Sequence, residues 1–119
     1  MKFRRKKTMN ILTFNGSHHI NTEERITLDA RFDSRSSFYG KATYSKENDV
    51  AVLFSYNTPV LFKDSKDNLY INADVEESLL LSQTTLRHIK EFIKQFCNRA
   101  VPSKQEIKDF YDFHVGVAC

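Results

Sequence analysis

The sequence predicts an α+β fold in which an antiparallel β-sheet, built as a meander, is followed by two C-terminal helices packed on one face of the sheet. Three observations predict it. Apolar residues alternate with a period of two through the middle of the chain, polar turns separate the alternating segments, and the period becomes helical after Glu77. The 119 residues suit one domain with a single core. We expect a basic flexible tail at 1–8 and a single domain at 9–119.

The strands are predicted from alternation, which is typical of strands that are buried on one face. Phe38, Gly40, Ala42 and Tyr44 share one face of the first strand of the meander, and Val52, Phe54 and Tyr56 share one face of the second. Turn-forming residues such as Asn, Asp, Ser and Pro separate the strands. The expected strands lie near 38–45, 50–56, 59–63 and 69–73, with Met9–Phe14 and Arg25–Phe32 as additional strands.

The first helix is expected to begin with Ser82 or Thr84 as its N-cap. It ends near Cys97 or Asn98, because Pro102 disfavours helical geometry at the residue before it. An apolar arc of about 100° then faces the sheet, and it consists of Leu86, Ile89, Phe92, Ile93 and Phe96.

A capping box opens the second helix, since Ser103 and Glu106 can each satisfy one free backbone amide. The helix runs through Phe113, and its buried side consists of Ile107, Phe110 and Tyr111. If the two helices form an antiparallel hairpin, the end of the second helix lies near His88.

Histidine and cysteine are ligands that zinc prefers in proteins. With the hairpin geometry, one self-consistent structural zinc site consists of His88, His114 and Cys119, completed by His18 or His19 from an N-terminal loop. Cys97 lies about 13 Å from His88 along the helix, which is too far to share an ion, so we expect a small core residue there. The alternative is that the histidines are ordinary surface residues. Zinc is the only cofactor that we expect.

Positive charge is concentrated at the N-terminus. The formal net charge is +3, but five of the 18 basic residues and none of the 15 acids lie in the first seven positions. Without those positions 13 basic residues face 15 acids, so the rest of the chain has a net charge of −2. The native start is either Met1 or Met9.

The remaining charges suggest two surfaces. An acidic run is interpreted as a partner-binding surface that competes with nucleic acid for a basic channel, and it consists of Asp64, Asp67, Asp74, Glu76 and Glu77. Cations interleaved with aromatic rings suit single-stranded nucleic acid instead. The candidate cations are Lys2, Arg4, Arg5, Lys6, Lys7, Arg31, Arg35 and Lys41, and the rings are Phe32, Phe38, Tyr39 and Tyr44.

Several function classes are excluded by motif. Three widely spaced glycines cannot form a dinucleotide fingerprint or a Walker-type phosphate loop, and no catalytic signature such as GxSxG or HExxH is present. We therefore expect a protein that is not an enzyme.

Apolar stretches are far shorter than the roughly 18 residues that cross a bilayer, and Ile11–Phe14 is too short for a signal peptide's apolar core. The expected location is the cytoplasm.

Three segments carry a family resemblance: SFYGKA at 37–42, SYNTPV at 55–60 and TTLRHIKEF at 84–92. In this order they resemble a family of small bacteriophage and prophage proteins of uncharacterised function, over roughly residues 9–97. The resemblance implies an accessory protein that acts inside the host bacterium. At the level of class, the chain is similar to anti-CRISPR proteins that bind Cas9.

These observations lead to two hypotheses about function. The first is a phage-encoded stoichiometric inhibitor that binds a host defence nuclease, with Cas9 as the favoured partner, and blocks the loading of its nucleic acid. The second is a small phage protein that binds nucleic acid or regulates expression through the basic residues. The sequence leaves the oligomeric state open.

Overall fold

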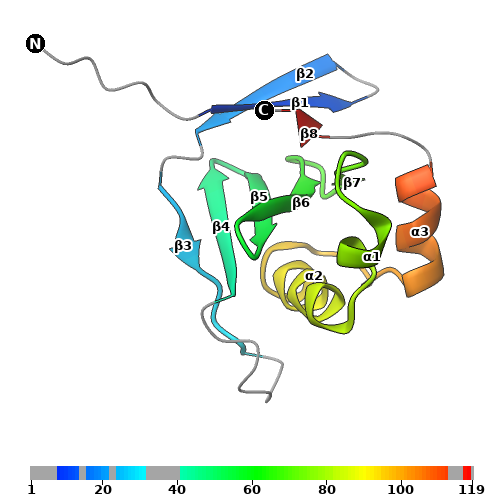
Figure 1. Ribbon diagram of the computed structural model, residues 1–119. Helices are drawn as coiled ribbons and strands as arrows, with labels where there is room; N and C mark the ends of the chain where they lie inside the picture. Colours follow the sequence, from blue (N-terminus) through cyan, green and yellow to red (C-terminus); the bar gives the residue numbers. More distant parts are fainter. Residues whose placement is uncertain (1–7, 14–15, 22–23, 32–40, 113–116, 119) are drawn as a thin grey trace, which may run out of the picture.

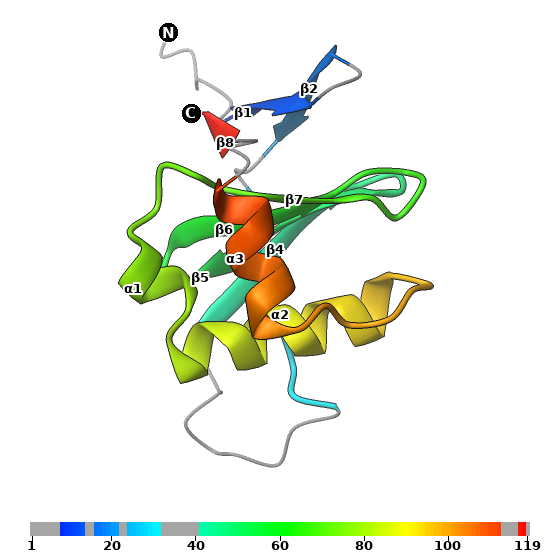
Figure 2. The same ribbon diagram turned by 90° about the vertical axis from the view of Figure 1, so that its right-hand side faces the viewer.

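The computed structural model describes the backbone and side chains of residues 24–31 and 41–112, and the backbone of residues 8–13, 16–21 and 117–118. The fold is α+β, as predicted. Three layers are stacked: a small three-stranded sheet, a five-stranded antiparallel sheet, and a layer of helices on the other face of the larger sheet (Figures 1 and 2).

The larger sheet is a meander with the strand order β3-β4-β5-β6-β7, and every neighbouring pair is antiparallel. Its strands are β3 (Ile26–Thr27), β4 (Ala42–Glu47), β5 (Val50–Ser55), β6 (Thr58–Lys63) and β7 (Leu69–Ile71). The predicted meander is therefore confirmed. The first residues expected in its 38–45 strand, Phe38 and Gly40, lie outside the described residues.

The smaller sheet has the strand order β2-β1-β8. Strands β1 (Thr8–Thr13) and β2 (Gly16–Asn21) form a hairpin, and β8 (Val117–Ala118) pairs antiparallel with the other edge of β1. Strand β1 was expected, although it includes Thr8 of the predicted tail. The expectation of a loop around His18 and His19 is wrong, because both residues lie on β2, which pairs along its whole length with β1.

The helical layer consists of α1 (Glu77–Leu80), α2 (Gln83–Phe96) and α3 (Lys104–Asp112). Ser82 is the N-cap of α2 and its side chain accepts a hydrogen bond from the Thr85 amide, so the open choice of N-cap falls on Ser82. The capping box of α3 is confirmed by reciprocal bonds between Ser103 and Glu106. Within the described ranges, none of the helices has the length and apolar character needed to cross a bilayer.

The helices do not form the antiparallel hairpin that we considered. Figure 2 shows α3 running across α2 rather than alongside it, next to β7 and α1. The Tyr111 hydroxyl donates a hydrogen bond of 2.9 Å to the Val75 carbonyl, which holds α3 against the segment before α1. The end of α3 is therefore not brought back along α2 toward His88.

The larger sheet is buried on both faces. The main core lies between the sheet and the helices and is built around Leu53, Leu61, Ile89, Phe92 and Ile93, all of which are completely buried. The face toward the smaller sheet carries a second cluster, which consists of Val52, Phe54, Phe62 and Tyr70. The apolar arc predicted for the first helix is confirmed, with Leu86 and Phe96 half-buried at its edges.

Tyr56 does not share the buried face of Val52 and Phe54, contrary to expectation. It is 45% exposed, because the β5–β6 connection is a two-residue turn in which Tyr56 and Asn57 have positive φ values of 51° and 67°. Two such residues are typical of the tight turns whose twist matches a hairpin. Strand β5 therefore ends at Ser55, whereas the apolar alternation in the sequence continues to Tyr56.

Candidate functional site

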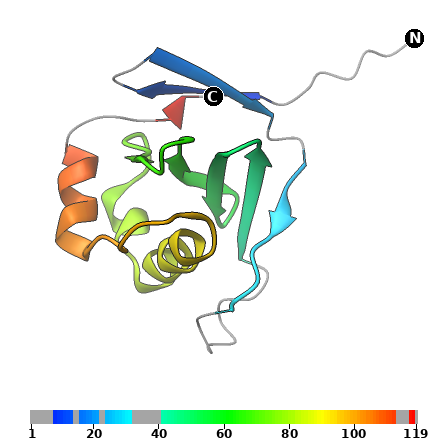
Figure 3. The ribbon, with the colours of Figure 1, turned by 180° about the vertical axis from the view of Figure 1, so that it is seen from behind.

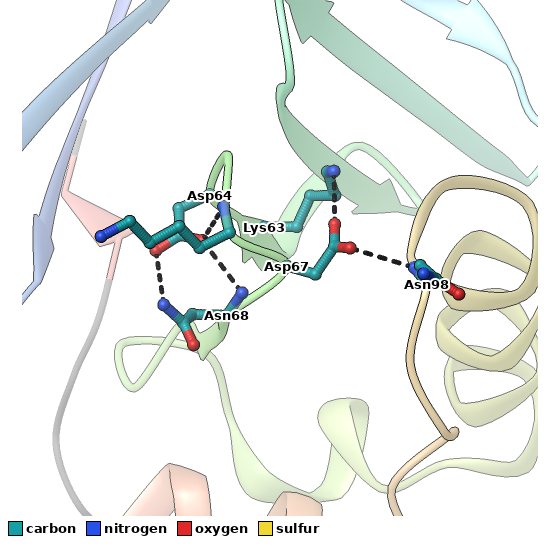
Figure 4. Close-up of polar contacts among 6 residues, drawn as sticks. Lys63, Asp64, Asp67, Asn68 and Asn98 are labelled. Carbon is teal, nitrogen blue, oxygen red and sulfur yellow. Dashed lines mark hydrogen bonds and ion pairs between the residues drawn. The ribbon is translucent and has the colours of Figure 1, made fainter.

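The fold splits the predicted acidic run into a structural part and an exposed part. Asp64 belongs to the structural part, since the residue is only 8% exposed. Its side chain accepts hydrogen bonds from the backbone amides of Lys66 and Asn68, both at 2.9 Å, and from the Asn68 side chain at 3.0 Å (Figure 4). The Tyr70 hydroxyl donates a further bond of 3.2 Å. The carboxylate therefore organises the β6–β7 turn.

The electrostatics of Asp64 follow from these bonds. Burial by itself raises the pKa of Asp64, but the hydrogen bonds from Asn68, Lys66 and Tyr70 outweigh burial and hold the pKa below its ordinary value of 3.8. A carboxylate with this many internal donors has little capacity left for an external partner. We therefore leave Asp64 out of the partner-binding surface.

Asp67 also stabilises the β6–β7 turn. It has a positive φ of 61°, and its carboxylate accepts from the Lys63 ammonium at 2.8 Å and from the Asn98 amide at 3.1 Å (Figure 4). The hydrogen bond from Lys63 is the main reason that the pKa of Asp67 is lowered. The contact with Asn98 connects the turn to the residue that follows the C-cap of α2, so Asp67 is bound within the protein.

The other three predicted acids are exposed, and the fold adds two acids from α3. We call this group the acidic surface, and it consists of Asp74, Glu76, Glu77, Asp109 and Asp112. Lys108 lies within it, with its ammonium 3.0 Å from the Asp112 carboxylate and 3.6 Å from that of Glu77. The hydrogen bond to Asp112 raises the pKa of Lys108. Two carboxylates, those of Glu77 and Asp112, lie beside this ammonium, and Asp74, Glu76 and Asp109 are exposed as well.

The acidic surface has a rigid base. Asn72 is buried, its side-chain amide donates to the Pro59 carbonyl at 2.8 Å, and its side-chain oxygen accepts from the Asp74 amide at 3.0 Å. Val75 is buried in the main core, and its carbonyl is bound by Tyr111. These bonds fix the backbone around Asp74 to β6 and to α3, so the segment that carries the exposed acids has a defined position, which suits electrostatic complementarity with a cationic surface.

The predicted nucleic-acid residues are placed only in part. Arg31 and Lys41 are exposed, whereas Lys2, Arg4, Arg5, Lys6, Lys7 and Arg35 lie outside the described residues, as do the rings Phe32, Phe38 and Tyr39. Tyr44 is half-buried and packs on Phe96 with ring centroids 4.7 Å apart, so part of its ring is used inside the protein. The Lys41 ammonium lies 5.8 Å above the ring of Tyr56, which is exposed.

His88 is completely buried. Its Nδ1 atom lies 2.8 Å from the Ser55 hydroxyl, which in turn lies 3.1 Å from the Thr85 hydroxyl. This polar cluster joins the end of β5 to the first turns of α2. Sequence reasoning missed it, although one signal was present: Thr85 and His88 lie four residues before the apolar residues Ile89 and Phe92, and therefore on the side of the helix that faces the sheet.

The structure describes only part of the zinc site predicted around His88, and it places the backbones of His18 and His19 far from that residue. Strand β2, with His18 and His19, lies across the larger sheet from α2 (Figure 2), and two packed layers separate their backbones by about 20 Å. His114 and Cys119 lie outside the described residues. In the part of the chain that the structure describes, no three His, Cys, Asp or Glu side chains are grouped as metal ligands.

Cys97 packs against the main core, as predicted, and is half-buried. Burial raises the pKa of the Cys97 thiol to about 11.

The His88 cluster lies within the segment that a comparison with known proteins identifies, and so does the acidic surface except for Asp112. A search of the curated proteins finds no match, and a search of the solved structures finds none either. A protein-family model matches residues 26–109, which cover the larger sheet, α1, α2 and the first two thirds of α3. The chain belongs to this family, a family of unknown function designated DUF8033.

Proposed function

We propose that the protein is a phage-encoded stoichiometric inhibitor that binds a host defence nuclease and carries out no catalysis. Cas9 is the partner to test first, because the sequence is similar at the level of class to anti-CRISPR proteins. The proposed site of action is the cytoplasm of the host bacterium.

The observation that carries this proposal is the acidic surface. Asp74, Glu76 and Glu77 remain exposed while the neighbouring acids Asp64 and Asp67 are used inside the protein. Asp109 and Asp112 extend the surface onto α3. A nuclease binds its nucleic acid in a cationic channel, and a rigid array of carboxylates can occupy such a channel in place of phosphates.

The expected mechanism is competition. The carboxylates raise the rate of encounter with a cationic channel, and the domain then excludes the nucleic acid by its volume. Because exposed charges are screened within about 10 Å at 0.1 M salt, inhibition should weaken as ionic strength increases. Nothing is consumed, so each inhibitor molecule blocks at most one nuclease.

The test is a titration of DNA cleavage by guide-loaded Cas9 and by Cas9 mixed with inhibitor before the guide is added. We expect cleavage to fall to zero at about one inhibitor per nuclease when inhibitor is added first. The variant Asp74→Asn/Glu76→Gln/Glu77→Gln should associate roughly tenfold more slowly. Cleavage that persists at excess inhibitor in both orders of addition would overturn the choice of Cas9.

A matched control removes the same number of negative charges elsewhere. Glu24, Glu47 and Asp49 are exposed acids that lie just before β3, at the end of β4 and in the β4–β5 turn, whereas α3 contacts β7 at the other end of the strand order, so Glu24→Gln/Glu47→Gln/Asp49→Asn changes the net charge equally. Equal loss of inhibition in both triple variants would mean that only total charge matters, and that the acidic surface is not the contact.

The second candidate function, nucleic-acid binding, is favoured by one observation. Tyr56 is exposed, and the Lys41 ammonium lies 5.8 Å from its ring centroid, so a base could stack while the cation meets a phosphate. The full chain and a chain starting at Met9 should be compared for binding to single-stranded oligonucleotides at two salt concentrations. Strong binding that survives truncation and is lost in Tyr56→Ser would support this function over the first.

A further inference from the structure

Strand β3 forms one edge of the larger sheet and has β4 as its neighbour (Figures 1 and 3). Its register pairs Ile26 with Tyr44 and Thr27 with Thr43. The other edge strand, β7, lies against α3. Edge strands carry backbone groups that can pair with a further strand, so β3 is where this sheet can be extended.

The direction of the backbone groups of β3 can be read from its contacts. The Leu28 amide donates to the Ala42 carbonyl at 3.0 Å, and the Glu24 carbonyl accepts from the Ser45 hydroxyl at 2.9 Å. Even-numbered residues of this segment therefore direct their backbone groups toward β4. Because direction alternates along an antiparallel strand, Arg25 and Thr27 direct their amides and carbonyls outward.

Ile26 lies between these two residues and is 54% exposed. Its exposed fraction is larger than that of every other large hydrophobic side chain that the structure describes, and Tyr56 follows at 45%. Ile26 is on the helical side of the sheet, because it is opposite Tyr44, which packs against the main core. Strand β3 thus has backbone groups that face away from β4 on both sides of an exposed β-branched side chain, that of Ile26.

We propose that β3 pairs antiparallel with β3 of a second copy of this chain, about a two-fold axis through Ile26. In this register Arg25 of each copy is opposite Thr27 of the other, so their outward amides and carbonyls form four hydrogen bonds. Ile26 of one copy is opposite Ile26 of the other. The two form a non-hydrogen-bonded pair, the kind of pair in which side chains on antiparallel strands approach most closely. The two sheets become one continuous sheet.

Two neighbouring contacts favour this register. The Asp29 carbonyl already accepts from the Gln95 side chain at 2.6 Å and from the Arg31 amide at 3.1 Å, which disfavours a register shifted so that Asp29 pairs. On the opposite face, Arg25 and Asp29 are both exposed. Across the two-fold axis each Arg25 lies diagonal to the Asp29 of the other copy, so the charges are complementary. This inference is independent of the proposed function.

The first test is sedimentation equilibrium of the full chain from micromolar to millimolar concentration. We expect the mass to rise from 13.9 kDa toward twice that value. Thr27→Pro should return the chain to a monomer and leave the thermal stability of the dilute monomer unchanged, because the amide it removes points away from β4. Ile26→Lys should raise the midpoint concentration by about tenfold or more. The control Tyr56→Ser changes the other exposed hydrophobic residue and should leave the mass unchanged.

The second test reads the register by disulfide cross-linking in a Cys119→Ser background. Ile26→Cys should form a disulfide-linked dimer rapidly, because its Cα atoms would be within the range that a disulfide spans. Thr27→Cys should cross-link much more slowly, since Thr27 is opposite Arg25. Faster cross-linking of Thr27→Cys would overturn the register. A monomer at every concentration, with no cross-linking in either variant, would overturn the proposal.

Discussion

Asp64 and Glu77 stand at the two ends of one acidic run, and the fold uses them in opposite ways. Asp64 is buried, and four donors from Lys66, Asn68 and Tyr70 bind its carboxylate. Glu77 is exposed and has a long contact with Lys108. The difference arises from local backbone: Asp64 immediately precedes a turn whose free amides face it, whereas Glu77 begins a helix. The position of an acid relative to free backbone donors decides whether it is available to a partner.

The largest expected effect is on Asp64. Asp64→Ala removes the acceptor of two backbone amides and two side chains, and should lower the free energy of unfolding by about 3 kcal/mol. Asp74→Ala is the matched control, because Asp74 is exposed, and should cost less than about 0.5 kcal/mol. Denaturant unfolding measures both. Similar losses in the two variants would show that the β6–β7 turn does not depend on this carboxylate.

The next effect concerns the pair of Lys63 and Asp67. The Lys63 side chain is 8% exposed, so Asp67→Asn leaves an ammonium in a poorly hydrated position and should cost about 1 to 2 kcal/mol. Asparagine tolerates the positive φ at this position. Lys63→Met removes the charge that needs compensation and should cost less. If Lys63→Met lowers the free energy of unfolding more than Asp67→Asn does, the ion pair stabilises the fold directly, and the role of Asp67 is not to neutralise a buried ammonium.

Acid should destabilise the protein through the two aspartates of the β6–β7 turn. The pKa values of Asp64 and Asp67 are lowered in the folded state, so their contribution to stability is complete above the unfolded value of 3.8. It is lost as the pH falls through the lower folded values. We expect stability to decline below about pH 4, and less steeply in Asp64→Asn. Parallel pH profiles for the two proteins would contradict this assignment.

The smallest expected effect on stability is that of the acidic surface itself. Asp74→Asn/Glu76→Gln/Glu77→Gln should change the free energy of unfolding by no more than about 0.5 kcal/mol, because exposed pairs such as Glu77 with Lys108 contribute little. Thermal unfolding at low and high salt measures the change. A loss comparable to that of Asp64→Ala would mean that these acids hold the fold and are not reserved for a partner.

Features with local signals could be predicted from the sequence. The alternation of β4, β5, β6 and β7, the N-cap at Ser82 and the capping box of α3 each depend on residues close in the chain. Strands β2 and β8 could not be predicted, because they are specified by pairing with β1 rather than by apolar alternation. Tyr56 was misplaced because turn geometry overrides alternation at the strand end.

The candidate site was less predictable than the fold. The exposure of Glu76 and Glu77 agrees with the sequence interpretation, but the burial of Asp64 depends on amides that become available only when the β6–β7 turn closes. Asp109 and Asp112 belong to the acidic surface because α3 lies beside α1, and no local sequence pattern indicates that arrangement of the helices. The contact between Ser55 and His88 joins segments 33 residues apart and has the same non-local origin.

The pairing of β1 with β8 joins residues as distant as Asn10 and Ala118. Contacts of this kind form slowly, because a long segment must be ordered before they can close. The meander and α2 can assemble earlier, with Val52, Phe54, Phe62 and Tyr70 still open to water on one side of the larger sheet. Native-state hydrogen exchange should therefore show the amides of β1, β2 and β8 opening at lower free energy than those of β5 and β6, so that transient loss of the smaller sheet is the main route by which this aromatic cluster meets solvent.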